Sequence, residues 1–446
     1  MLNSNLMDTL KKDKIDVGIV YAGNPCQYAI LHVLGIPFIY YDVDGFSDET
    51  VVASGTPWNL DAYSSRRQPS VSRPNFASRL FNGFHLLQES LTQNSHPLIA
   101  KIISKRYKNL DDPITKQFSE DYEIKKKFKH FPDVNKIKQS AELYFVNTDP
   151  LLEDGTAFPT NVIPVGGLHI DHTKPLFSPW NTTIAAAEEG MIIVSLGTQT
   201  DSSKMSAAHA TTLLGALSKL TKYRIYWRVG PNMNLPEIDL EKIPSHINMT
   251  TFIPQNDLLA HRRCKLFITN GGMSSVMEAI AHGVPMIGIP LYGINYANLQ
   301  KVQNKGLGLI VEKEHLNEGT LFSAINEVLT NKRFQTAAKD ASKEFQHREE
   351  SPFEKALHLI EHVGRHRGAK FFKPSKQFVL SGWTRGNNLD FWIIASAFCI
   401  VALLFLRSVI GLLWRCLGTH GPPAGSAGIE IQKGKMGLKK ETKKTK

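Results

Sequence analysis

The stretch Cys264–Gln300, CKLFITNGGMSSVMEAIAHGVPMIGIPLYGINYANLQ, decides the fold. Its run KLFIT is apolar on both faces, as expected of a strand buried inside a parallel sheet. The pair Gly271-Gly272 predicts a sharp turn, and a helix follows from about Met273 to His282, where Gly283 stops it. The run VPMIGIP predicts the next strand. Strand, turn, helix and strand in this order indicate a sheet covered by helices.

Similar runs lie on both sides of this stretch. KIDVGIVYAG, LGIPFIYYDV and AELYFVNTDP predict strands in the first part of the chain, and GMIIVSLGT, YRIYWRV and INMTTFIP predict strands in the second. Residues 64–132 are expected to form helices and loops. Asn161–Asn181 contains Pro and Gly without a sustained pattern, which indicates a linker. Two α/β domains in tandem form a cleft, and their ligands bind at the carboxyl ends of the strands.

An apolar segment near the C-terminus predicts one membrane helix. Phe391–Leu406 holds sixteen uncharged and almost wholly apolar residues, which span ~24 Å of a ~30 Å hydrocarbon layer. The segment extends to Trp414 if the Arg407 side chain reaches the interface. A buried core helix is the alternative, but a Lys-rich tail follows directly. Basic residues favour the cytoplasmic side, so we expect a cytosolic tail and a body across the membrane.

The positive charge is concentrated in that tail. From Arg407 onward nine basic residues stand against two acidic ones, which accounts for +7 of the net charge of +11. Nucleic-acid binding requires a basic folded domain, so we expect no nucleic-acid partner. Lys443-Lys444 resembles the dilysine signal for retrieval to the endoplasmic reticulum, whereas Met1–Asp13 has no apolar core and is not expected to be a secretory signal peptide. Four cysteines suggest no disulfide framework.

The turn at Gly271-Gly272 has the features of a phosphate site. The N-terminus of the following helix presents N–H groups and a partial positive charge. Glu278, one turn further along, is placed to accept hydrogen bonds from two vicinal hydroxyls, as an acidic residue does for a ribose. The alternatives are a purely structural turn and a solvent-facing glutamate. Together the two features predict a nucleotide site.

The residues around this turn resemble the nucleotide-sugar signature of the UDP-glycosyltransferases, in particular the membrane-bound UDP-glucuronosyltransferases. The matching residues are Gly271, Gly272, Ser275, Glu278, Ala279, Gly283, Pro285, Met286, Pro290, Leu291 and Asn298. Further similarity lies in the runs VGGLH, VSLGT and PQNDLL and in the single C-terminal membrane helix. The resemblance implies an α/β fold of two Rossmann-like domains, the GT-B fold with its first domain truncated, plus one C-terminal transmembrane helix.

The resemblance also implies an order of domains. A partial acceptor-side domain at 1–165 and a linker at 166–187 come before a UDP-sugar-binding domain at 188–350. A helix with its connection to the membrane at 351–388, the transmembrane helix at 389–414 and a basic cytosolic tail at 415–446 complete the chain.

By resemblance, the second domain binds UDP. Phe252 stands where the family usually has Trp against the uracil ring, and Gln255 resembles the uracil-reading glutamine. Glu278 resembles the ribose ligand, and Arg228 adds charge near the phosphates. The residues implied in UDP binding are Gly197, Thr198, Arg228, Phe252, Gln255, Asn270, Gly271, Gly272, Ser275 and Glu278.

The sequence departs from the family pattern where the sugar would bind. Asn270 replaces the histidine before the glycine pair and cannot carry a positive charge. The Asp-Gln pair that holds the transferred sugar is Ile294-Asn295 here, so a carboxylate is lost and only an amide remains. The resemblance still implies sugar binding by Asn295 and Asn298. The donor is expected to be UDP-glucuronate or UDP-glucose, with no metal and no cofactor.

The catalytic residues stay unknown. The family's base is a histidine oriented by an acid; Tyr21 stands at the position of the acid, and the histidine would lie upstream of residue 1. We interpret His32 as a packed helix residue, and His169 and His172 as linker residues without a partner.

The resemblance implies an enzyme of the endoplasmic reticulum membrane, with its body in the lumen. It would transfer a sugar from UDP-sugar to a small lipophilic acceptor with inversion. The alternative is a catalytically inactive fragment or pseudoenzyme that binds UDP and associates with full-length relatives. Assembly into homo- or hetero-oligomers is left open.

Overall fold

The computed structural model describes residues 4–56, 76–93, 112–153, 158–170, 172–185, 187–198, 205–230, 235, 238–374 and 389–417. The chain divides into two compact units, Met1–Asn387 and Asn388–Lys446. Lys443-Lys444 and nearly all of the predicted tail lie outside the described residues.

The first sheet of the larger unit has four parallel strands in the order β1-β2-β3-β4. Its strands are β1 (Gly18–Tyr21), β2 (Phe38–Asp42), β3 (Leu143–Val146) and β4 (Val162–Pro164). Its helices are α1 (Ser4–Lys12), α2 (Pro25–Leu34), α3 (Asp48–Ser54), α4 (Phe76–Gln93), α6 (Asp112–Glu120), α7 (Tyr122–Lys127) and α8 (Val134–Lys138). Because side chains alternate along a strand, Tyr40 and Tyr144 pack under α2, α3 and α8, and Ile39 and Phe145 pack on the other face.

The second sheet has six parallel strands in the order β10-β9-β8-β5-β6-β7. They are β5 (Gly190–Ser195), β6 (Tyr223–Arg228), β7 (Ile247–Thr250), β8 (Cys264–Thr269), β9 (Met286–Gly288) and β10 (Gly308–Ile310). The chain runs outward from β5 to β7, then returns to β8 beside β5 and continues to the other edge. The order therefore reverses between β5 and β8, and such a switch point is where parallel α/β sheets open a crevice for a ligand.

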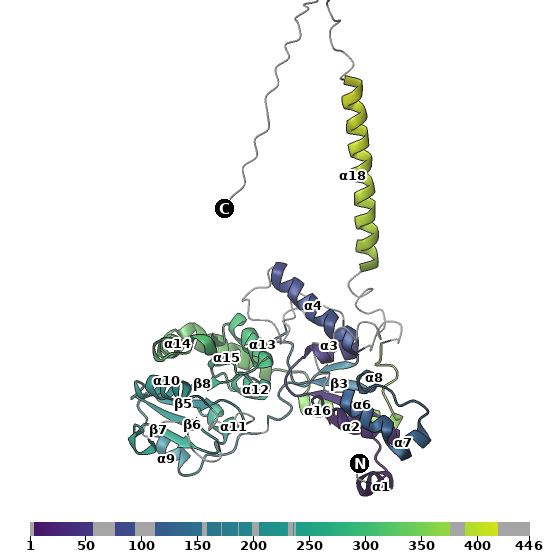
Figure 1. Ribbon diagram of the computed structural model, residues 1–446. Helices are drawn as coiled ribbons and strands as arrows, with labels where there is room; N and C mark the ends of the chain where they lie inside the picture. The colour runs from purple at the N-terminus through teal and green to yellow at the C-terminus, as the bar shows by residue number, and fades with distance from the viewer. Residues whose placement is uncertain are drawn as a thin grey trace, which may run out of the picture. The chain divides into compact units, whose positions relative to one another are not determined.

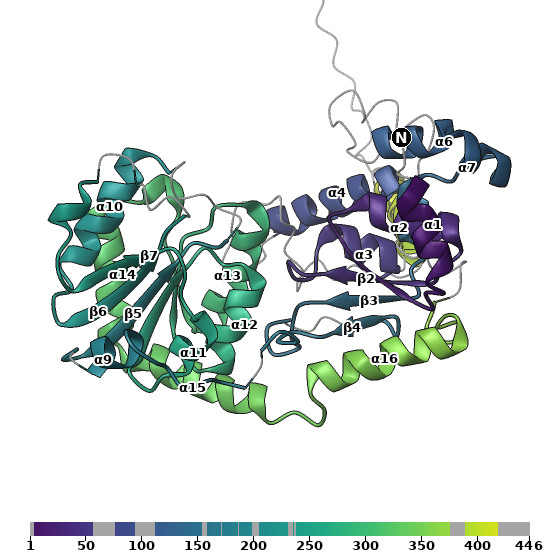
Figure 2. The same cartoon turned by 90° about the horizontal axis from the view of Figure 1, so that it is seen from below.

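Helices cover both faces of the second sheet (Figure 2). They are α9 (Trp180–Ala185), α10 (Ala207–Ser218), α11 (Gln255–Ala260), α12 (Met273–Ala281), α13 (Gly293–Asn304), α14 (Glu318–Thr330) and α15 (Lys332–Gln346), with the short 3-10 turns η2 (Leu240–Lys242) and η3 (Lys313–His315). Helix α16 (Pro352–His366) returns to the first sheet, where Ala356, Leu359 and Val363 pack on Ile39 and Phe145.

The expected linker at Asn161–Asn181 is partly wrong. Val162 and Ile163 pair with β3 as strand β4, and α9 begins at Trp180. The Pro and Gly residues around these short elements hide them, since three residues carry no visible alternation. Within the described part of 64–132, α4, α6 and α7 confirm the expected helices. Cys26 and Cys264 are not joined by a disulfide.

The smaller unit contains α18 (Leu389–Leu417), the long helix near the C-terminal end in Figure 1. Its segment Ile393–Leu413 is 21 residues long, apolar enough to cross a membrane, and not buried against the protein. The predicted C-terminal apolar helix is therefore present. Its side chains are exposed, whereas those of the alternative, a core helix, would be buried.

Candidate functional site

The turn between β8 and α12 is built around two glycines with different requirements. Gly271 has φ +87°, and a Cβ there would lie 2.4 Å from Leu299 Cγ and 2.8 Å from the carbonyl oxygen of Asn295. Only glycine fits this position. Gly272, the N-cap of α12, has φ −58°, and the nearest atom to a Cβ there is Asn270 Oδ1 at 3.6 Å. Open space therefore lies in front of Gly272, at the N-terminus of α12.

The ends of β5, β6 and β8 meet at this turn. Gly197 follows β5 with φ +87°, and a Cβ there would lie 2.7 Å from Asn270 Nδ2. Arg228 at the end of β6 donates to the Gly197 carbonyl oxygen at 2.7 Å. The next residue, Thr198, is exposed. The structure thus gathers six of the predicted UDP-binding residues at the switch point between β5 and β8, namely Gly197, Thr198, Arg228, Asn270, Gly271 and Gly272.

Glu278 is joined to two other predicted residues. Gln255, the first residue of α11, donates from Nε2 to Glu278 Oε2 at 2.6 Å and to Ser275 Oγ at 3.0 Å. The Glu278 side chain is only 14% exposed, so a solvent-facing glutamate is excluded. Phe252, just before α11, is 68% exposed and offers a free ring face close in sequence to Gln255.

His169 contacts the same carboxylate. Its Nε2 lies 3.5 Å from Glu278 Oε1 and 3.2 Å from the Ser274 carbonyl oxygen. The interpretation of His169 as a linker residue without a partner was therefore wrong. Its partners lie more than a hundred positions along the chain, and only the VGGLH resemblance marked this residue in the sequence.

The other two histidines interpreted from the sequence, His32 and His172, are placed differently. The His32 ring stacks on Phe128 and meets the edge of Phe131, which confirms that it is packed. Burial, followed by the charge of Lys127, lowers the pKa of His32. His172 lies exposed on the segment between the two sheets, and the interpretation that it has no partner was also wrong.

The two asparagines implied in sugar binding lie buried in α13. Asn298 donates from Nδ2 to the carbonyl oxygens of Asp44 at 3.1 Å and Gly271 at 3.2 Å, so it joins the first domain to the glycine turn. Asn295 is 6% exposed, and its Oδ1 has no hydrogen-bond donor among the described residues. A buried acceptor of this kind normally has a partner in the protein or an ordered water.

Tyr21, at the end of β1, donates from Oη to Asp44 Oδ2 at 3.4 Å. Burial raises the pKa of Tyr21, and the neighbouring Asp44 carboxylate raises it further, so the phenol is neutral near pH 7 and cannot act as an acid's carboxylate would. Asp44 itself was missed by sequence reasoning, although Asp42 at the end of the strand FIYYD and Asp44 two positions further on were a visible signal. Its backbone contact with Asn298 puts Asp44 next to the glycine turn.

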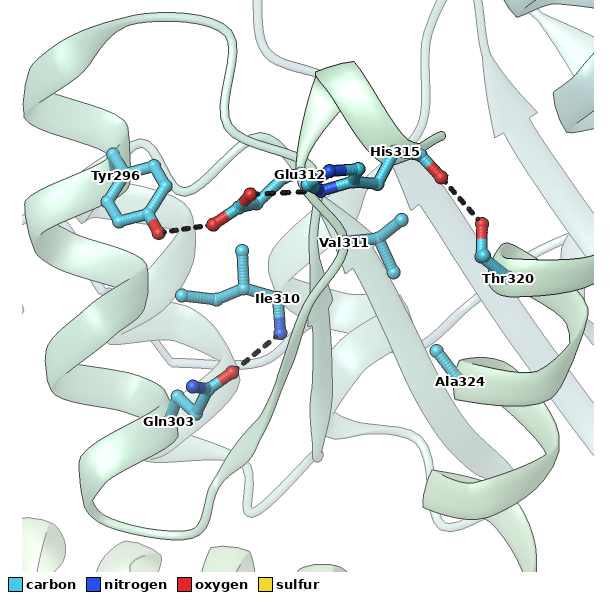
Figure 3. Close-up of a pocket in the computed structure, with 8 residues that line it drawn as sticks. All are labelled: Tyr296, Gln303, Ile310, Val311, Glu312, His315, Thr320 and Ala324. Carbon is cyan, nitrogen blue, oxygen red and sulfur yellow. Dashed lines mark hydrogen bonds and ion pairs between the residues drawn. The ribbon is translucent and has the colours of Figure 1, made fainter. Parts of the chain in front are cut away.

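Two further features lie apart from this turn. A cavity of about 310 Å³ lies between α13, the end of β10 and α14, where Glu312 accepts hydrogen bonds from Tyr296 Oη at 2.8 Å and from His315 Nδ1 at 3.1 Å (Figure 3). None of the predicted site residues lines it. Among the described residues no cluster of His, Cys, Asp and Glu is arranged to hold a metal.

Solved glycosyltransferases share this fold. The spinosyn forosaminyltransferase SpnP superposes with a TM-score of 0.52 at 15% identity, over 80% of this chain and 78% of its own. The calicheamicin glycosyltransferase CalG4 superposes with a TM-score of 0.51 at 14% identity, over 81% and 78%. Two parallel sheets and these likenesses confirm the GT-B fold.

The chain is also similar in sequence to glycosyltransferases of mammals. The chain is 26% identical over 416 residues to "UDP-glucuronosyltransferase 3A1" of Bos taurus, which is 92% of this chain and 72% of the relative. It is 26% identical over 377 residues to "2-hydroxyacylsphingosine 1-beta-galactosyltransferase" of Mus musculus, which is 84% of this chain and 64% of the relative. The family model "UDP-glucoronosyl and UDP-glucosyl transferase" matches residues 1–420. With nearly its whole length matched, this chain belongs to the UDP-glycosyltransferase family.

Proposed function

We propose that this chain binds a UDP-sugar at the switch point between β5 and β8 and transfers the sugar to a small lipophilic acceptor with inversion. The observation that most directly supports UDP-sugar binding is the hydrogen bond from Gln255 to Glu278, beside the open N-terminus of α12. It brings a polar amide, a carboxylate and a phosphate-type turn together at one edge of the sheet, which are the three kinds of group that a nucleoside diphosphate needs.

Each part of UDP has candidate partners. The diphosphate would lie over Gly272 and the first turn of α12, with Gly197, Thr198, Gly271, Ser275 and Arg228 around it. The uracil ring would stack on Phe252 and be read by Gln255, and the ribose hydroxyls would donate to Glu278. Asn270, held at the same turn, would donate to a phosphate oxygen.

The sugar would lie near α13. The place of Asn295 supports this, because its backbone carbonyl oxygen lies against Gly271 of the glycine turn. Asn298 would act mainly by holding α13 and Asp44 beside Gly271. UDP-glucuronate and UDP-glucose are the proposed donors.

The reaction is a displacement at the anomeric carbon. The acceptor oxygen forms a bond to that carbon as the bond to the diphosphate breaks, and UDP leaves with the electron pair. The acceptor proton must pass to a base, which we leave unassigned. Tyr21 in place of an acid and Ile294 in place of a carboxylate favour a second candidate function, a UDP-binding pseudoenzyme that associates with relatives.

We further propose that α18 anchors the chain in the endoplasmic reticulum membrane, with its body in the lumen and its basic tail in the cytosol. The exposed apolar length of Ile393–Leu413 and the basic residues that follow in the sequence support this orientation.

Calorimetry with UDP and a transfer assay with a phenolic acceptor test these proposals together. UDP should bind to the detergent-solubilised chain, and Glu278→Gln should weaken binding about tenfold or more by removing a charge-assisted hydrogen bond. Product formation from UDP-glucuronate or UDP-glucose would support the enzyme. Binding without product would favour the pseudoenzyme, and no heat at millimolar UDP would overturn both.

A further inference from the structure

His169 contacts Glu278 from outside the second sheet and its helices. It lies on the segment that leads from β4 to β5, between the two sheets. Its ring is 32% exposed, and the carboxylate that it meets is 14% exposed. The contact is thus largely shielded from water.

The neighbours of His169 fix where its hydrogen lies. The Ser274 carbonyl oxygen and the Glu278 carboxylate can only accept, so Nε2 must carry the hydrogen to bond either of them. The Ser274 carbonyl belongs to the first turn of α12 and keeps the ring against that helix. The N–H group is thereby held within reach of Glu278 Oε1.

The Glu278 carboxylate is consequently held from two directions. Gln255 donates to Oε2 from α11, and His169 approaches Oε1 from the segment between the sheets. Each carboxylate oxygen has two lone pairs, so both oxygens keep capacity for hydroxyl donors. A carboxylate fixed before the ligand arrives binds it with less loss of side-chain entropy.

We propose that His169 is a positioning residue for ribose recognition: it orients the Glu278 carboxylate toward the ribose hydroxyls of the bound nucleotide. This rests on the proposed function, since it requires that UDP binds at the glycine turn. The effect is specific to the hydroxyls, because His169 acts through Glu278 and not on the phosphates or the base.

The test compares UDP with 2′,3′-dideoxy-UDP by calorimetry on the full chain. The wild type should prefer UDP by about tenfold or more, as expected for hydrogen bonds to a charged group. His169→Ala should reduce this preference to below about threefold by weakening UDP, with little change for the dideoxy compound. His169→Gln, whose amide can place an N–H near the same point, should restore part of the preference. His172→Ala on the same segment is the matched control and should keep it.

The outcomes are distinguishable. An equal loss of affinity for both ligands, or an unchanged preference in both His169 variants, overturns the positioning role and leaves UDP binding intact. No further loss of preference when His169→Ala is added to Glu278→Gln supports it. Absence of UDP binding by the wild type overturns the proposed function, and this inference with it. If His169→Ala does not fold, the comparison of His169→Gln with the wild type decides. The glutamine places its N–H group at a slightly different point, so the preference for UDP over 2′,3′-dideoxy-UDP should still be lower than in the wild type.

Discussion

At the scale of single residues, Asp42 in the first domain is a buried carboxyl group whose pKa is raised. It lies at the end of β2, 2% exposed, and its Oδ2 accepts from Ser47 Oγ at 2.5 Å, Ser47 N at 3.2 Å and Thr50 Oγ1 at 2.5 Å. Burial raises the pKa of Asp42 to about 6, although these hydrogen bonds oppose the shift. The folded protein therefore holds this proton more tightly than the unfolded chain.

The pH dependence follows from that difference. Because the folded pKa of about 6 exceeds the ordinary value of 3.8, the contribution of Asp42 to stability falls as the pH rises from about 4 to about 6, and then stays constant. The total loss is about 3 kcal/mol. Asp42→Asn keeps an acceptor oxygen for Ser47 and Thr50 but cannot ionise. We expect the unfolding free energy of Asp42→Asn to gain about 3 kcal/mol over the wild type between pH 4 and pH 7.

Urea unfolding at several pH values, followed by far-UV circular dichroism, measures this difference. Asp340→Asn on the exposed side of α15 is the control and should change the unfolding free energy by less than about 0.5 kcal/mol, because its ion pair with Lys343 is exposed. A difference between Asp42→Asn and the wild type that does not change with pH would contradict the buried, protonated carboxyl.

The site residues that belong to a local sequence motif could be predicted. Those that reach the site only because the chain folds back could not. Gln255, Ser275 and Glu278 belong to a recognisable pattern, and the structure brings them into contact. His169 and Asp44 reach the site from distant parts of the chain: Ser274 lies 105 positions after His169. No local sequence pattern encodes such a contact, so hydrogen bonds between the two domains could not be predicted from the sequence.

At the scale of elements, the β8-α12 turn offers a matched pair of substitutions. Gly271→Ala should lower the unfolding free energy by roughly 2–4 kcal/mol, because a Cβ at positive φ would also collide with Leu299 and the Asn295 backbone. Gly272→Ala should leave stability within about 0.5 kcal/mol, since its φ is ordinary and its surroundings are open. The added methyl would occupy the space proposed for the diphosphate, and UDP affinity should then fall about tenfold.

Thermal unfolding and UDP calorimetry on both variants separate the two roles. If Gly272→Ala binds UDP as tightly as the wild type, phosphate does not lie over the N-terminus of α12. If instead Gly271→Ala is as stable as the wild type, the turn is less constrained than its geometry indicates.

Some helices and strands could be predicted from the sequence with their limits, and others could not. Strand β8 and helix α12 were predictable within a residue or two, because an apolar run, two glycines and Gly283 mark both ends. Strands β4 and β10 contain three residues each, and β10 begins with Gly308, so neither shows the alternation that marks a strand. Their existence depends on pairing with β3 and β9.

At the scale of the whole molecule, the return of α16 to the first sheet shows why domain limits are hard to read from sequence. Its apolar residues Ala356, Leu359 and Val363 complete the core beneath β2 and β3, although some two hundred residues of chain separate them. The amphipathic pattern of α16 indicates a helix but does not say which sheet it covers. One layer of the first domain is thus supplied by α16, near the end of the larger unit.

The proposed luminal position of the body leads to the last prediction. Asn181-Thr182-Thr183 is a glycosylation sequence, and Asn181 is exposed at the start of α9, whereas Asn248 of the second such sequence is half-buried in β7. With a luminal body, we expect endoglycosidase H to increase the gel mobility of the protein made in animal cells. Asn181→Gln should abolish that shift, and Asn248→Gln should leave it. A protein that resists carbonate extraction but shows no shift would have its body in the cytosol, which would place the sugar donor on the opposite side of the membrane from the one proposed.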